Sequence, residues 1–253
     1  MKTLNQYLIT ESAEEDKLKH LEHAEDHIIN AGHEGFKHAF NTLHGVHTAL
    51  TKKKSNVSVS QKFDGSPSIV FGHNPENGKF FVASKSAFNK TPKLNYTAAD
   101  IEKNHGHAPG LVSKLKTALK HLPKVAPKEG VFQGDVMHTP EDIKHTDSHI
   151  GFTPNTITYS THKNSEEGKK ALKSKIGVAV HTAYTGKTID DLKAHYNPSL
   201  SHFGEHDDVH LMHSTFPTHK VEYSEKQQNK FQKHMQNACL LYTSDAADDT
   251  PCV

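Results

Sequence analysis

The sequence predicts an α+β fold in which antiparallel sheets are flanked by helices. Segments with alternating apolar residues predict strands, and the dipeptide Asn77-Gly78 predicts a tight turn between two of them. Segments with apolar residues three and four positions apart predict helices. The expected strands are 57–62, 68–72 and 79–85, and the expected helices that follow are 97–104, 111–122 and 164–174, the last with an N-terminal cap in Asn164-Ser165-Glu166-Glu167.

An N-terminal helical segment is expected at 12–55. Apolar residues at helical spacing between Glu14 and Leu50 predict two helices that are interrupted at Gly32. A polar linker at 52–55 follows, so we expect the main domain to occupy 56–238.

Composition limits the classes of function. A chain of 253 residues is long enough for a buried core, and its formal net charge of +1 argues against a protein that binds nucleic acid over its whole surface. The two cysteines lie at 239 and 252, close to the C-terminus. No apolar stretch approaches the roughly 20 residues that span a membrane, so we expect no membrane partner.

The segment 57–65 provides the candidate nucleophile. If 57–62 is a strand, Val57 and Val59 face a core while Lys62 lies on the opposite face, and Asp64-Gly65 then turns the chain. An amine attacks phosphorus only in its neutral form, so a catalytic lysine needs burial or a nearby cation, and Lys85 is a candidate for that cation.

The tetrapeptide Lys62-Phe63-Asp64-Gly65 resembles motif I of the covalent nucleotidyltransferases, which include the ATP-dependent DNA and RNA ligases and the mRNA capping enzymes. Together with segments 80–90, 133–135 and 154–157, it also resembles an uncharacterised ligase-like family of large tailed bacteriophages. The resemblance implies a nucleotidyltransferase domain, of the ATP-grasp-like ligase adenylation type.

This resemblance also implies roles for particular residues. Lys62 would form a covalent lysyl-AMP, and Asp64 and Gly65 would shape the nucleotide pocket beside it. Lys85 stands where ligases usually have an arginine, and Asp135 stands where their carboxylate contacts the ribose.

The segment 177–184 has the layout of the ligase strand that carries a base-stacking aromatic residue. His181 is the candidate substitute there, and a helix is expected at 188–192. The resemblance implies ATP with Mg²⁺ or Mn²⁺ as cofactors and a nucleic-acid 5′-phosphate end as the acceptor. These residues leave ATP or GTP, and DNA or RNA, open.

Two departures from the ligase pattern stand out. The chain has no arginine, and lysine cannot reproduce the two parallel hydrogen bonds of a guanidinium group. The acidic metal-binding motif and the Lys-x-Lys motif expected downstream are also missing. Residues 239–253 resemble a translated sequencing adapter, so we expect a natural sequence that is truncated near Ala238 and a printed chain with little or no activity.

The first residues, 1–11, resemble the segment that a phage prohead protease removes after a glutamate, here Glu11. This implies a protein of the infected bacterial cytoplasm that is packaged in the virion. The alternative is a short amphipathic helix.

Other functions stay open. Gly186-Lys187-Thr188 suggests a P-loop, but His181 occupies the position of its first glycine. Histidines at 20, 23 and 27, and the cluster 202–210, contain metal-binding residue types, but a solvated surface is the preferred interpretation because no closed set of ligands with fixed spacing is present. The main alternative is a non-catalytic virion protein that keeps the fold and binds nucleotide or nucleic acid.

Overall fold

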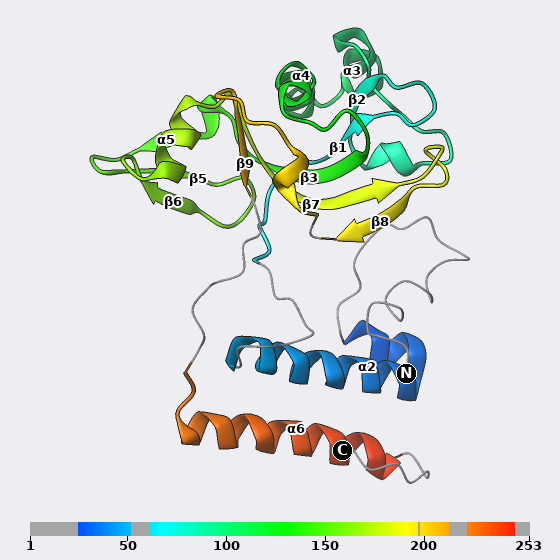
Figure 1. Ribbon diagram of the computed structural model, residues 1–253, viewed down its shortest axis with the longest axis vertical. Helices are drawn as coiled ribbons and strands as arrows, with labels where there is room; N and C mark the ends of the chain where they lie inside the picture. Colours follow the sequence, from blue (N-terminus) through cyan, green and yellow to red (C-terminus); the bar gives the residue numbers. More distant parts are fainter. Residues whose placement is uncertain (1–24, 52–60, 197, 213–221, 246–253) are drawn as a thin grey trace. The chain divides into compact units, whose positions relative to one another are not determined.

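The structure is a computed structural model that describes residues 25–51, 61–196, 198–212 and 222–245 (Figure 1). The chain divides into two compact units. The main unit contains residues 62–214, and the helical unit contains residues 20–61 and 215–253. The leader expected at 1–11 lies outside the described residues.

A mixed six-stranded sheet forms the centre of the main unit (Figure 1). Its strands are β1 (Ser68–His73), β2 (Phe80–Ala83), β3 (Val131–His138), β7 (Ile176–Thr185), β8 (Lys193–Tyr196) and β9 (Val209–Met212). The order is β2-β1-β3-β7-β8, and β9 also pairs with β7. All neighbours are antiparallel except β9, which runs parallel to β7. The expectation of antiparallel pairing therefore holds for every pair in this sheet except that one.

Two helices cover one face of this sheet. They are α3 (Ala98–His105) and α4 (Pro109–His121), close to their predicted positions (Figure 1). Thr97 caps α3, because its hydroxyl accepts a hydrogen bond from the Asp100 backbone while the Asp100 carboxylate accepts one from the Thr97 backbone. The apolar faces of both helices join the sheet in one buried core, with Ile101 and Leu115 fully buried.

A second, three-stranded antiparallel sheet follows β3. It contains β4 (Lys144–His145), β5 (His149–Phe152) and β6 (Tyr159–His162), and it leads into helix α5 (Glu166–Lys173). Ser165 caps α5 as the sequence predicts, since its hydroxyl accepts a hydrogen bond from the Gly168 backbone. Short 3₁₀ helices complete the unit: η1 (Lys85–Phe88), η2 (Leu122–Lys124), η3 (Pro140–Asp142) and η4 (Leu200–His202).

The helix expected at 188–192 is wrong, because this segment forms turns and no helix. Thr188 accepts a hydrogen bond from the Asp191 backbone at 3.2 Å, and the Ile189 backbone donates to Glu76 at 3.3 Å. The Ile189 side chain is buried against the sheet. These long-range contacts outweigh the weak helical preference of so short a segment.

The helical unit contains α2 (Asp26–Thr51) and α6 (Glu225–Asp245). The predicted interruption at Gly32 is confirmed, since this residue has φ 51° and ψ −125° inside α2. His47 of α2 is buried and stacks on Phe231 of α6, with their ring centroids 4.1 Å apart. Among the described helices of both units, none is long and apolar enough to cross a membrane.

A pair of buried histidines spans strand β7 at Gly177. His138 of β3 and His210 of β9 both pair with Gly177 of β7, and their rings meet over its backbone, with His138 Nε2 and His210 Nδ1 3.2 Å apart. A Cβ on Gly177 would lie 2.2 Å from His138 Nε2, so only glycine leaves room for the His138 ring over this position. The carboxylate of Glu167 lies 2.7 Å from His210 Nε2.

The hydrogen bonds from Glu167 through His210 to His138 determine which ring nitrogen of each histidine carries the proton. His210 Nε2 donates to the carboxylate, so in a neutral ring its Nδ1 accepts from His138 Nε2. His138 Nδ1 is then an acceptor, and it is buried without a hydrogen-bond partner. The pKa of His138 is lowered from 6.5 to about 4, mainly by burial and to a smaller extent by electrostatic repulsion from His210.

This pKa predicts that stability falls in mild acid. The folded pKa of His138 lies below the unfolded value, so its contribution is complete above pH 6.5 and is lost as the pH falls toward 4. His138→Gln should remove up to about 3 kcal/mol from the pH dependence of the unfolding free energy, measured in urea between these pH values. His145→Gln, at an exposed site, should leave the slope unchanged; equal slopes in wild type and His138→Gln would contradict the assignment.

Candidate functional site

The candidate nucleophile, Lys62, lies in a loop that enters the main sheet. Of the strand expected at 57–62, residues 57–60 lie outside the described residues, and 61–65 have no regular secondary structure. The expected strand is therefore wrong for residues 61 and 62, because this segment pairs with the sheet only from Ser66 onward. The Lys62 side chain is exposed.

Gly65 places this loop directly on β3. A Cβ at Gly65 would lie 2.5 Å from Asp135 Cβ and 2.7 Å from Met137 Sδ, so no side chain fits there. Two backbone hydrogen bonds then join the loop to the strand: the Ser66 N–H donates to the Val136 carbonyl at 3.1 Å, and the Val136 N–H donates to the Pro67 carbonyl at 3.0 Å. Main-chain contacts therefore join this end of the loop to β3.

Asp64 faces the turn between β5 and β6. Asn155 Nδ2 donates to both oxygens of its carboxylate, at 3.2 and 3.1 Å, and Thr156 Oγ1 donates to one of them at 3.0 Å. Hydrogen bonds from Asn155 and then Thr156, with a smaller contribution from the charge of Lys62, lower the pKa of Asp64. The carboxylate is therefore ionised at neutral pH, and its oxygens are directed at protein donors.

Asp135 and His181 lie together on the sheet face that Gly65 contacts. His181 Nε2 is 3.6 Å from Asp135 Oδ1, and His181 Nδ1 is 2.8 Å from Thr182 Oγ1. A β-bulge brings them together: Gln133 pairs with Thr182 but Gly134 pairs with Val180, so His181 is the extra residue. The His181 side chain is 40% exposed, so part of it is accessible to a ligand.

A row of polar side chains extends this face beyond the predicted residues. Ser68 Oγ accepts a hydrogen bond from Gln133 Nε2 at 3.0 Å, and the Tyr184 hydroxyl donates to Gln133 Oε1. Burial raises the pKa of Tyr184 well above its usual value, so this hydroxyl remains a donor. The Phe88 ring packs against Tyr184, with centroids 5.0 Å apart. In the sequence, only the segment Gln133-Gly134-Asp135 indicated that polar residues gather on this face.

Lys85 follows the end of β2 that lies on the same side of the sheet as Ser68 of β1 and Asp135 of β3. Ala83 pairs with Val70, so the chain leaves the sheet toward Ser68, which itself pairs with Asp135. The Lys85 side chain is exposed at the start of η1, where Ser84 provides the cap. The structure therefore brings Gly65, Asp135 and His181 into contact range and places Lys85 at the same end of the sheet.

The residues that the structure describes contain no group of three or more histidine, cysteine, aspartate or glutamate side chains that could hold a metal ion. The metal-binding residue types at 202–210 are divided among different partners, since His210 meets Glu167 while Asp208 meets His121 and Lys124. Of the histidines at 20, 23 and 27, only His27 is described.

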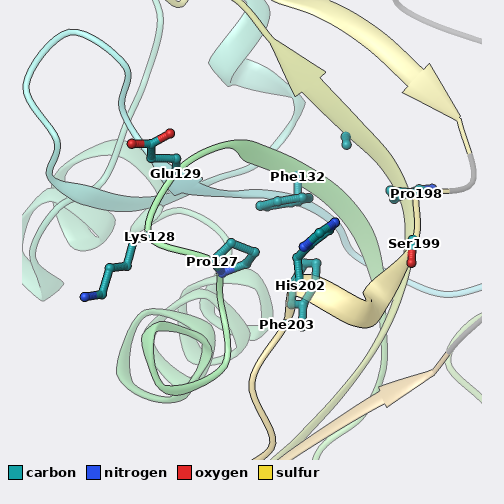
Figure 2. A pocket seen from close by; sticks show the side chains of 9 residues that line it. Pro127, Lys128, Glu129, Phe132, Pro198, Ser199, His202 and Phe203 are labelled. Atoms are coloured by element: carbon teal, nitrogen blue, oxygen red, sulfur yellow. The ribbon is translucent and has the colours of Figure 1, made fainter.

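A pocket of about 560 Å³ opens on the other face of the sheet (Figure 2). Phe132 of β3 lines it, and neighbouring residues along a strand point to opposite faces, so it does not share the face of Asp135. Figure 2 shows the rings of Phe132, His202 and Phe203 close together, with the Lys128 and Glu129 side chains directed away from them. The candidate nucleophile therefore lies apart from this pocket.

Comparison with known proteins places this architecture in a family. Residues 16–248 match the model of a family of unknown function, DUF6267. The chain belongs to this family. The match extends beyond Ala238 into the segment 239–253 that resembles a translated adapter. No curated protein and no solved structure matches the chain.

The contact of Gly65 with β3 predicts the effect of a single methyl group. Gly65→Ala should lower the free energy of unfolding by about 1–3 kcal/mol, because the new Cβ overlaps Asp135 and Met137 and forces the loop away from the strand. Urea unfolding measures the change. Gly110→Ala is the matched control, since nothing lies within 4 Å of a Cβ in that helix and alanine should be neutral or stabilising there. Equal stabilities for the two variants would contradict the close contact.

Proposed function

We propose that this chain is a covalent nucleotidyltransferase of the ligase type, in which Lys62 takes AMP from ATP and passes it to the 5′-phosphate end of a nucleic acid. One observation carries the proposal. The loop that contains the Lys-x-Asp-Gly sequence lies on β3 with Gly65 against Asp135, and His181 of β7 lies beside that carboxylate. Three of the residues that the sequence resemblance singles out, Gly65, Asp135 and His181, thus lie together on one sheet face although they come from distant segments.

The chemistry requires two transfers at phosphorus. In the first, Lys62 Nζ forms a bond to the α-phosphorus of ATP, the bond to the β-phosphate oxygen breaks, pyrophosphate leaves, and the nitrogen loses a proton. In the second, an oxygen of the 5′-phosphate attacks the same phosphorus, the phosphorus–nitrogen bond breaks, and the lysine takes up a proton again.

The neighbouring residues would bind and orient the nucleotide. Asp135 accepts hydrogen bonds from ribose hydroxyls, and the partly exposed His181 ring stacks on the base. The ammonium group of Lys85 would attract the phosphates electrostatically. Because Lys62 is exposed, the bound nucleotide itself must provide much of the shielding from water that its reaction needs.

Among the described residues, no group of three or more histidine, cysteine, aspartate or glutamate side chains forms a metal centre that the protein would hold by itself. We therefore assign no step to a metal bound by these side chains. A divalent ion that arrives with ATP is held mainly by the phosphates and water.

Formation of the lysyl-AMP is the decisive test. The full-length product of the gene, and the printed chain in parallel, would be incubated with ATP and Mg²⁺ and digested for mass spectrometry. We expect one AMP on the peptide that contains Lys62, its loss in Lys62→Ala, and its retention in Lys79→Ala, a control at another exposed lysine.

Absence of an adduct with ATP, GTP and NAD would instead favour the non-catalytic binding protein. An adduct that persists in Lys62→Ala would move the nucleophile to another residue.

A further inference from the structure

We propose that Asp64 is a positioning residue, and that the turn between β5 and β6 acts as a clamp that holds the Lys62 loop in place through it. The catalytic consequence rests on the proposed function, whereas the clamp itself is a property of the fold. The carboxylate of Asp64 thus serves the loop and leaves nucleotide binding to other groups.

The clamp grips both the side chain and the backbone of Asp64. Three donor contacts reach its carboxylate, two from Asn155 Nδ2 and one from Thr156 Oγ1. The Asp64 N–H also donates to the Tyr159 hydroxyl at 2.7 Å. Because hydrogen bonds to an ionised carboxylate are the stronger kind, this set fixes the residue that lies two positions after Lys62.

The clamp is itself anchored in the main unit. The hydroxyls of Thr153 and Thr158 meet across the turn at 2.9 Å, and the rings of Phe152 and Tyr159 stack with centroids 5.8 Å apart. Phe152 is buried, packs with Met137 of β3, and lies 4.6 Å from the His138 ring. A continuous series of contacts therefore runs from the core of the sheet to Asp64.

Packing of the adjacent residue supports the same role. The Phe63 ring lies against Tyr159, with centroids 5.8 Å apart. The loop thus contacts the clamp through Phe63 and Asp64 and contacts β3 through Gly65 and Ser66. These contacts on two sides determine the direction in which the chain presents Lys62.

Exchange of the two polar partners tests the proposal. Asn155→Asp puts two carboxylates face to face, and Asp64→Asn removes the charge that the donors hold. In the double variant Asp64→Asn/Asn155→Asp, an amide at 64 can donate to a carboxylate at 155. If Asp64 only positions the loop, this exchange should restore function. If it binds nucleotide or metal directly, the exchange should not.

Two readouts keep this test separate from the proposed function. Hydrogen exchange of the peptide covering 61–66, followed by mass spectrometry on the printed chain, should accelerate in each single variant and return to the wild-type rate in the double variant. In the full-length product of the gene, the rate of AMP transfer to Lys62 should fall about 10- to 100-fold in Asn155→Asp and recover to within about threefold in the double variant, with the affinity for ATP little changed. Asn229→Asp is a matched control, because it makes the same charge change at an exposed site in α6.

Each outcome decides the proposal. Unchanged hydrogen exchange in both single variants would overturn the clamp. Restored exchange without restored AMP transfer would show that Asp64 acts directly on the nucleotide, and would overturn the positioning role. If wild type forms no adduct, the proposed function fails, and hydrogen exchange alone then decides whether the clamp exists.

Discussion

The pairing of β3 with β7 is the constraint on which the main unit depends. Its register shifts twice, between Gln133 and Gly134 and between Val136 and His138. The first shift turns His181 toward Asp135, and the second aligns His138 with Gly177 and so with His210. The Asp135–His181 pair and the His138–His210 pair both exist because the two strands are not in continuous register. The face of the sheet that α3 and α4 cover keeps an uninterrupted apolar core.

Local sequence predicted the elements that local forces determine. The strands β1 and β2 follow from alternation and from the turn at Asn77-Gly78, and α3, α4 and α5 follow from apolar spacing and caps such as Ser165. The segment 188–192 failed because burial of Ile189 and its bond to Glu76 come from residues far away in sequence. The parallel pairing of β9 was equally invisible, since a strand of four residues contains no information about its direction.

The same limit applies to the candidate site. Resemblance to the ligase-like family singled out Gly65, Asp135 and His181, and their proximity depends on a bulge that no sequence pattern announces. Asn155 and Thr156 belong to a segment that contributed to the resemblance, yet their partner lies 91 and 92 positions earlier. Contacts over such distances become visible only when the sheets are in place.

The meeting of two imidazoles over Gly177 also constrains the order in which this sequence can change. Any side chain at 177 must overlap the ring of His138, so substitution there is blocked while that histidine remains. A smaller residue at 138 would first have to open the space, and it would leave His210 without its partner on β3. The effects of substitutions at 138 and 177 are therefore coupled, and a side chain at 177 requires a smaller residue at 138.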